Sequence, residues 1–238
     1  MSRRVLVTGG TRGIGAALVE RLVARGDKVA ATGRTPESVF DARNQRPTVD
    51  WRVLDLTGDV DWVSWLDDFG GDRFDLVILN AGIQVLREFA PGAAPSSISI
   101  EEELRVNLSA PIAMAEALPG RLAPGAVVVF VTSGLALAPK RSSPVYCASK
   151  AGLRSFSKAL RAQWAPLGWR VVEALPPLVD TDMTRGRGSR KISAAAAASQ
   201  LLAGVDAGRD EIDIGATRLL RALMRISPSL GERVMRNR

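Results

Sequence analysis

A glycine-rich segment near the N-terminus, TGGTRGIG at residues 8–15, constrains the fold of this chain more than any other part of the sequence. It follows a short aliphatic run, 3–8, and leads into a segment, 16–26, whose apolar residues recur at helical spacing. A second strand-like run, 28–33, comes next. Strand, glycine turn, helix and strand together form the βαβ unit in which dinucleotide-binding turns occur. The sequence therefore predicts a nucleotide site at the start of an α/β domain.

Three glycines of this segment have separate physical roles. Gly9 permits a tight turn because it carries no Cβ. Gly13 lets backbone N–H groups approach a pyrophosphate, and Gly15 lets the helix pack close to the strand. The N-terminus of the helix adds partial positive charge, which favours a bound phosphate. A plain tight turn without a ligand is the alternative interpretation.

Two arginines indicate which dinucleotide this turn would bind. An acidic residue after the second strand would hold a ribose 2′-hydroxyl and repel a 2′-phosphate. That region instead reads TGRT at 32–35, with Arg34, and Arg12 lies inside the glycine turn. Guanidinium groups form strong bidentate contacts with phosphate oxygens. We therefore predict NADPH/NADP⁺ as the cofactor in preference to NADH/NAD⁺.

The rest of the chain continues the alternation of strands and helices. Ser99 and Glu102 form a capping box before a helix that carries Asn107. Further strands are expected at 49–54, 74–79, 126–132, 170–175 and 211–215. About seven strands alternating with helices predict an α/β fold: a single-domain, doubly wound Rossmann fold with a parallel sheet flanked by helices. We expect one domain over 1–238, whose segment 216–238 is a basic helical C-terminal tail broken near Pro228.

Composition excludes several classes of function. The chain of 238 residues has no histidine, which excludes Ser-His-Asp and Cys-His mechanisms and the usual zinc sites, and we expect no metal. Its one cysteine excludes an internal disulfide and fits a reducing cytoplasm. No apolar run is long enough for a transmembrane helix, and the N-terminus does not resemble a signal peptide. We therefore expect a cytoplasmic protein with no membrane partner.

The net charge of +7 admits two interpretations. A basic protein can bind nucleic acid, or it can have a basic surface that attracts anionic cofactors. No basic strand interleaved with aromatic residues and no nucleic-acid recognition motif appears in the sequence. We therefore favour the second interpretation and expect a small-molecule substrate and no nucleic-acid partner.

Tyr146, the only tyrosine, precedes Lys150 by four residues in a helical segment, 143–161. On a helix the two side chains share one face, one turn apart. An ammonium beside a phenol is expected to lower the pKa of the phenol and let it exchange a proton near neutral pH. Ser133 ends a strand-like run thirteen residues before Tyr146, so its hydroxyl could reach the same substrate oxygen.

Taken together, these motifs resemble those of the short-chain dehydrogenase/reductase family over residues 3–215. TGGTRGIG is similar to its cofactor turn, and Asp55-Leu56 to the acidic position that contacts adenine. LNAG at 79–82 is similar to its NNAG motif, with Leu79 in place of the first asparagine. The closing stretch, GRDEIDIG at 208–215 followed by the tail, looks like the DltE-like branch of the family.

The resemblance implies site residues. Its catalytic tetrad corresponds to Asn107, Ser133, Tyr146 and Lys150. The cofactor-binding residues that it implies are Gly9, Thr11, Arg12, Gly13, Ile14, Gly15, Arg34, Asp55, Leu56, Asn80, Ala81, Gly82, Tyr146, Lys150, Val179 and Thr181. Tyr146 would donate the proton in reduction, Lys150 would bind the nicotinamide ribose, Ser133 would orient the substrate oxygen and Asn107 would hold a water. The chain departs from the family at Pro176-Pro177, where Pro-Gly is usual. Since proline fixes φ and lacks an N–H, Pro177 could alter the cleft wall.

These residues predict NADPH-dependent reduction of the carbonyl of a small molecule. Reduction of an imine, iminium or hemiaminal carbon, oxidation of an alcohol with NADP⁺, and a non-catalytic nucleotide-binding scaffold are the alternatives. Residues 84–97, 135–143 and 178–193 are expected to form the cleft walls. Within the basic loop 184–193, Arg185, Arg187, Arg190 and Lys191 would suit an anionic substrate or would face water. The family resemblance further implies a homodimer or homotetramer.

Overall fold

A computed structural model describes residues 2–189 and 191–236 of the chain. Within those residues, seven parallel strands form the central sheet in the order β3-β2-β1-β4-β5-β6-β9. The strands are β1 (Arg4–Val7), β2 (Lys28–Gly33), β3 (Asp50–Val53), β4 (Phe74–Leu79), β5 (Leu122–Val131), β6 (Arg170–Leu175) and β9 (Glu211–Asp213). The helices are α1 (Gly13–Ala24), α2 (Pro36–Gln45), α3 (Trp62–Asp67), α4 (Ile100–Leu104), α5 (Ala110–Ala117), α6 (Pro144–Trp164), α7 (Ala194–Asp206), α8 (Thr217–Ile226) and α9 (Pro228–Arg236). This arrangement confirms the predicted doubly wound Rossmann fold.

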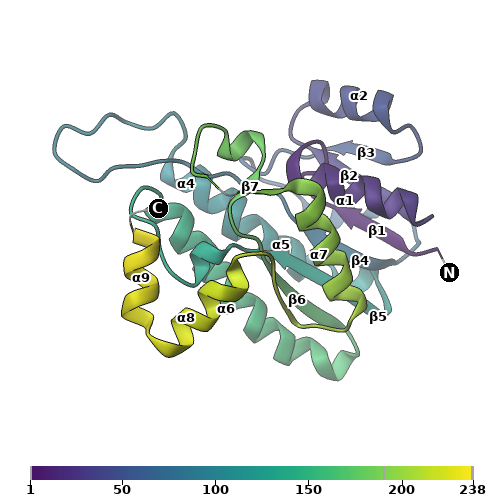
Figure 1. Cartoon of the computed structure of the whole chain (residues 1–238). Helices are drawn as coiled ribbons and strands as arrows, with labels where there is room; N and C mark the ends of the chain where they lie inside the picture. The colour runs from purple at the N-terminus through teal and green to yellow at the C-terminus, as the bar shows by residue number, and fades with distance from the viewer. Residues whose placement is uncertain (1, 190, 237–238) are drawn as a thin grey trace.

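The strands read as continuous apolar runs because both faces of the sheet are covered. Successive side chains of a strand point to opposite faces. In β1, Val5 and Val7 belong to the core beneath α1 and α7, whereas Leu6 belongs to the core beneath α3, α5 and α6. β4 divides in the same way, with Leu76 and Ile78 on the first side. Figure 1 shows the sheet between these two layers of helices.

The order of the strands determines where a ligand can bind. The chain runs outward from β1 through β2 to β3, and then returns to pair β4 with the other side of β1. In open parallel sheets, ligands bind at the carboxyl ends of the strands beside such a reversal. The glycine turn follows β1 at this place, and the long segment 80–99 follows β4. Figure 1 shows that this segment and the α8–α9 pair lie at the same end of the molecule.

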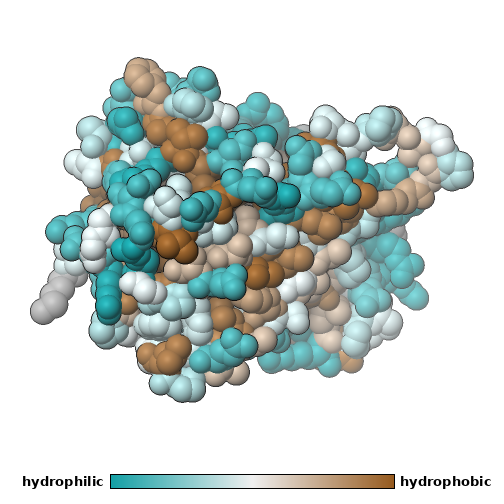
Figure 2. Space-filling model, turned by 180° about the vertical axis from the view of Figure 1, so that it is seen from behind, coloured by the Kyte–Doolittle hydropathy of each residue, from teal (hydrophilic) through white to brown (hydrophobic). Residues whose placement is uncertain are grey.

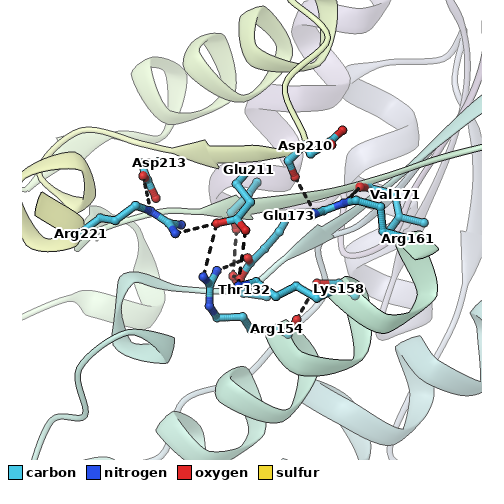
Figure 3. A network of polar contacts seen from close by, with 12 residues as sticks. Thr132, Arg154, Lys158, Arg161, Val171, Glu173, Asp210, Glu211, Asp213 and Arg221 are labelled. Atoms are coloured by element: carbon cyan, nitrogen blue, oxygen red, sulfur yellow. Dashed lines mark hydrogen bonds and ion pairs between the residues drawn. The ribbon is translucent and has the colours of Figure 1, made fainter. Parts of the chain in front are cut away.

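The C-terminal tail forms two helices, as predicted, and the break falls at Ser227 before Pro228. A network of ion pairs connects α8 to the sheet (Figure 3). Arg221 of α8 pairs with Glu211 and Asp213 of β9, and Glu211 also pairs with Arg154 of α6. Arg154 in turn pairs with Glu173, which is fully buried in β6. The tail is therefore held against the body of the protein by charged contacts.

The segment after β6 contains more regular structure than the sequence indicates. β7 (Val179–Asp180) pairs in parallel with β8 (Ile192–Ser193), so the end of the predicted loop 184–193 is a short strand. The pairing brings Asp180, which precedes the basic loop, beside Ser193 at the end of the loop. Two residues per strand are too few for a period-two pattern, which is why sequence periodicity could not reveal this pair.

Two kinds of feature are absent from the described part of the chain. None of its helices combines the length and the apolar character needed to cross a membrane. The same residues contain no group of three or more His, Cys, Asp or Glu side chains placed to hold a metal ion.

Candidate active site

A cleft of about 960 Å³ opens at the carboxyl ends of the strands. The glycine turn and the ends of β2, β4 and β5 form one side of it, and the segment after β6 and the C-terminal tail form the other. Every site residue predicted from the sequence lines this cleft except Asn107. The fold thus brings together residues from seven separate parts of the chain.

The glycine turn is built by backbone groups in close contact. Gly9 has φ +66°, which a residue with a side chain rarely adopts. A Cβ at position 15 would lie 2.0 Å from the Gly9 carbonyl oxygen, so only glycine fits there. The Asn80 amide donates hydrogen bonds to the carbonyl oxygens of Thr8 (3.0 Å) and Gly9 (3.1 Å). Asn80 therefore fixes the turn from the end of β4.

The loop after β4 packs directly on this turn. The Thr8 hydroxyl accepts hydrogen bonds from the backbone N–H groups of Asn80 (3.0 Å) and Ala81 (3.1 Å). A Cβ on Gly9 would lie 3.0 Å from the Ala81 Cα. On the opposite side, a Cβ on Gly13, whose φ is +56°, would lie 3.1 Å from the Thr181 Cγ2. The turn is thus enclosed between the ends of β4 and the segment after β6.

Charged groups lie at the outer end of the glycine turn. The Arg34 Nε is 3.6 Å from the Asp55 Oδ1, and both side chains are exposed. Asp55 also accepts hydrogen bonds from the backbone N–H (3.0 Å) and hydroxyl (2.8 Å) of Thr57. The backbone hydrogen bond from Thr57 is the main cause that lowers the pKa of Asp55. Arg12 lies exposed in the turn itself, so two guanidinium groups border this end of the cleft.

Asn107 lies behind the cleft wall and not on it. Its side chain is 1% exposed and belongs to a π-helical turn, Arg105–Ser109. The amide accepts a hydrogen bond from the Ile83 N–H (2.9 Å) and donates one to the Ile83 carbonyl (2.8 Å). A Cβ on Gly82 would lie 3.0 Å from the Asn107 Oδ1 and 3.4 Å from the Lys150 Nζ. Asn107 thus positions the backbone at 82–83, and π-helical turns of this kind are frequent at functional sites.

Tyr146 and Lys150 lie one turn apart on α6 and both line the cleft. Lys150 is 3% exposed, and its Nζ donates a hydrogen bond to the Val131 carbonyl (2.9 Å) at the end of β5. The same Nζ is 5.9 Å from the centroid of the Tyr146 ring. Ser133 follows β5, is 7% exposed, and its hydroxyl accepts a hydrogen bond from the Leu135 N–H (3.1 Å).

The pKa values of this pair correct one expectation. Burial raises the pKa of Tyr146 to about 12, and the Ser133 hydroxyl only partly opposes that rise. Burial also lowers the pKa of Lys150 to about 8. The expected lowering of the phenol pKa by Lys150 is not found, because the ammonium is directed to the Val131 carbonyl and desolvation of the phenolate dominates.

Some cleft residues were expected only as part of the cleft walls, and those of the tail were not expected in the cleft at all. Gln84 and Arg187 lie in the cleft, where the Arg187 Nη1 donates a hydrogen bond to the Gln84 Oε1 (3.0 Å). The tail contributes Ala216, Thr217, Leu219, Leu220, Leu223, Val234 and Met235. The apolar positions of the two tail helices were the available signal, but they do not reveal which part of the protein they face.

Pro177, the departure from the family motif, also lines the cleft. The Pro176 carbonyl accepts a hydrogen bond from the Gly134 N–H (2.9 Å), which joins this segment to the residue after Ser133. A Cβ on Gly215 would lie 3.3 Å from the Pro177 ring. The second proline therefore packs against the start of the tail.

Comparison with known proteins places the chain in a family. The family model for short chain dehydrogenase matches residues 3–191. The chain is 33% identical over 222 residues to the uncharacterized oxidoreductase DltE of Bacillus subtilis (strain 168), covering 87% of this chain and 86% of the relative. It is 31% identical over 183 residues to the L-xylulose reductase of Bos taurus, covering 76% of this chain and 73% of that enzyme.

Solved structures agree with the fold. The crystal structure of a short chain dehydrogenase from Burkholderia cenocepacia J2315 in complex with NADP superposes with a TM-score of 0.87 at 29% identity, covering 98% of this chain and 97% of that one. A short-chain dehydrogenase from Sphingobium yanoikuyae has a TM-score of 0.79 at 24% identity, covering 96% and 94% of the two chains, and supports the fold alone. With the family match over most of its length, the chain belongs to the short-chain dehydrogenase family.

Proposed function

We propose that this oxidoreductase reduces the carbonyl group of a small molecule with NADPH. The observation that carries the proposal is the convergence of Ser133, Tyr146 and Lys150 on one cleft, next to the glycine turn. General-acid chemistry requires such a hydroxyl within reach of the substrate oxygen, and the cleft has room for both a dinucleotide and a substrate.

The glycine turn fits a dinucleotide. Gly9 and Gly13 leave backbone partly exposed, Gly15 lets α1 pack closely on the turn, and α1 begins at Gly13. Arg12 and Arg34 at the outer end suit a 2′-phosphate, and the relative from Burkholderia cenocepacia was crystallised with NADP. When bound, NADPH would supply the hydride for the reduction. Thr11, Ile14, Asp55, Leu56, Asn80, Ala81, Gly82, Val179 and Thr181 line the same part of the cleft and would complete the binding site.

The chain's own residues would handle the proton. With its pKa raised to about 12, Tyr146 keeps its proton at neutral pH and can donate it to a developing alkoxide. Ser133 would orient the substrate oxygen toward that phenol. Lys150 would bind the nicotinamide ribose, because its Nζ lines the cleft beside Gly82, and with a pKa of about 8 it is mostly charged at pH 7. Asn107 would keep the backbone at 82–83 in place beside Lys150.

The test is consumption of NADPH, followed by its absorbance, on a panel of ketones, aldehydes and cyclic imines. Tyr146→Phe should lower kcat/KM by about 10²–10⁴, the usual contribution of a general acid, while NADPH binding stays within about threefold. Near-normal turnover by this variant would refute the role of Tyr146. Turnover of the imines with a much milder effect of Tyr146→Phe would favour imine reduction instead, because a pre-formed iminium needs less acid assistance.

We also propose a homodimer or homotetramer. Figure 2 shows hydrophobic patches among hydrophilic residues on the side of the molecule opposite to that of Figure 1. Large apolar side chains such as Phe40, Val63 and Leu167 are more than half exposed. Scattered exposed apolar residues are ordinary, so the mass in solution, measured by light scattering during gel filtration, is the deciding observation. A mass corresponding to one chain would contradict this proposal.

A further inference from the structure

The cations of the basic loop do not all face the cleft. The Lys191 Nζ donates a hydrogen bond to the Thr184 carbonyl (2.7 Å) and lies 3.3 Å from the Asp180 carboxylate. Arg185 is highly exposed and pairs with Asp182. Arg190 lies outside the described residues. Of the three described cations, Arg187 is the one that lines the cleft.

Arg187 has an unusual environment for a half-buried cation. Its Nη1 donates to the Gln84 Oε1 at 3.0 Å, and the Gln84 Nε2 donates to the Ser143 Oγ at 3.2 Å. Ser143 is fully buried and precedes Tyr146 by three residues at the start of α6. Both partners in this chain of hydrogen bonds are neutral. Among the described residues, Arg187 forms no ion pair with a carboxylate.

The charged residues that line the cleft also leave an excess of positive charge. Its basic lining residues are Arg12, Arg34, Lys140, Lys150 and Arg187, and its acidic ones are Asp55 and Asp182. Each of these acids already has a guanidinium partner, Arg34 for Asp55 and Arg185 for Asp182. Arg12 and Arg34 lie at the outer end of the glycine turn, so Lys140 and Arg187 leave positive charge on the substrate side. An anionic group bound there would meet a charge-assisted donor that the protein itself does not neutralise.

The wall formed by the tail is apolar and not charged. Leu219, Leu220, Leu223, Val234 and Met235 contribute apolar side chains to it, and Leu135 adds another from the segment after β5. Charged groups of α8 such as Arg221 are instead directed to β9. The substrate side thus offers a guanidinium from the segment after β6 and an aliphatic surface from the tail.

We propose that the substrate is an oxo acid: a ketone or aldehyde that carries a carboxylate bound by Arg187 and an apolar body that packs against the C-terminal helices. This inference rests on the proposed function. Two N–H groups on one edge of a guanidinium match the two oxygens of a carboxylate. The hydrogen bond from the Arg187 Nη1 to the Gln84 Oε1 holds the guanidinium in place. Arg187 is therefore a specificity-determining residue.

The experiment compares matched pairs of substrates. Each oxo acid, with the carbonyl one to four carbons from the carboxylate and an aliphatic chain, is assayed beside its methyl ester. Wild-type protein should prefer at least one acid over its ester by about tenfold to hundredfold in kcat/KM, the expected contribution of one charge-assisted pair. Arg187→Gln should lose that preference through a higher KM for the acid, with less than a threefold loss for the ester. The KM for NADPH should change by less than twofold.

Arg185→Gln is the matched control, because it removes the same charge from the same loop at an exposed position. It should retain the preference for the acid. Turnover of acids and esters with equal efficiency, or a preference that survives in Arg187→Gln, would overturn this inference alone. A higher KM for NADPH in Arg187→Gln would also overturn it, since Arg187 would then bind the cofactor. No turnover of either member of any pair would overturn this inference, whereas the proposed function is overturned only if the panel of ketones, aldehydes and imines is not turned over either.

Discussion

The two walls of the cleft are built on different principles. The wall around the glycine turn is made of closely packed backbone: a Cβ on Gly15 would collide with the Gly9 carbonyl oxygen, and a Cβ on Gly9 would press on Ala81. The wall of the tail is made of side chains on helices, and ion pairs such as Arg221 with Asp213 hold it to the sheet. The first wall tolerates almost no change in residue type, whereas the second can change its lining while its anchors remain. Under the proposed function, cofactor and substrate recognition would lie in parts of the molecule that can vary independently.

The largest effect is expected in the backbone wall. In Gly15→Ala the new methyl group would lie 2.0 Å from the Gly9 carbonyl oxygen, so the turn must open. We expect NADPH binding to weaken by roughly 30-fold, equivalent to about 2 kcal/mol of overpacking strain. Fluorescence titration with NADPH measures this change. Gly120→Ala, at a glycine with open space around it, is the control. Equal affinity in the two variants would remove the distinction between the walls.

A second variant tests whether Arg34 contributes to the preference for NADPH over NADH. Arg34→Ala removes one of the two guanidinium groups at the outer end of the turn and its pair with Asp55. The preference for NADPH over NADH should fall by about tenfold, the equivalent of about 1.4 kcal/mol for one charge-assisted contact. The ratio of kcat/KM with the two cofactors is the measurement, and Arg73→Ala, at an exposed position away from the cleft, is the control. An unchanged ratio would exclude Arg34 from phosphate binding.

Arg221, which anchors the tail, allows a test in which substrate binding should weaken and NADPH binding should not. Arg221→Met should leave α8 less firmly held to Glu211 and Asp213, and displace the apolar lining. We expect the KM for substrate to rise about fivefold through misplacement of the wall, with NADPH affinity within twofold of wild type. Arg225→Met, at an exposed position of the same helix, is the control. A parallel loss of cofactor affinity would mean that the two walls are not independent.

The smallest effect concerns Lys150, which lines the cleft beside Gly82. Its pKa of about 8 in the folded chain lies below the value of about 10.4 in an unfolded chain. Between these pH values the unfolded chain binds more protons, so rising pH favours the folded state. The free energy of unfolding of wild type relative to Lys150→Met should therefore rise by about 1 kcal/mol between pH 8 and pH 9. Urea denaturation at the two pH values measures it; a difference independent of pH would contradict the lowered pKa.

The parts of the site predicted from sequence are those where local chemistry restricts the residue type. The positive φ of Gly9, the spacing of Tyr146 and Lys150 on one helix face, and the capping box of Ser99 and Glu102 are all short-range features. The role of the tail could not be predicted in this way. Arg221 and Arg154 are anchored through Glu211, whose distance along the chain from Arg154 is 57 residues, and no local pattern specifies such a pair.

The pKa of the Tyr146 phenol shows a second limit of prediction from sequence. Spacing placed Tyr146 and Lys150 on one face of α6 correctly, but it could not show that the ammonium is directed to the Val131 carbonyl. The direction of the pKa shift depends on how much water each group loses on folding. Similarly, the side-chain amide of Asn107 was predicted to be important, yet its pairing with both backbone groups of Ile83 depends on a π-helical turn.

The tail has a consequence for comparisons across the family. The family model ends at residue 191, whereas the aliphatic wall of the cleft is contributed by residues 216–235. Proteins grouped by that model can therefore share a chemical step and still differ in the compounds they accept. Exchange of the last two helices between such relatives would be a direct way to transfer selectivity from one enzyme to another, provided that the acidic pair on β9 is exchanged with them.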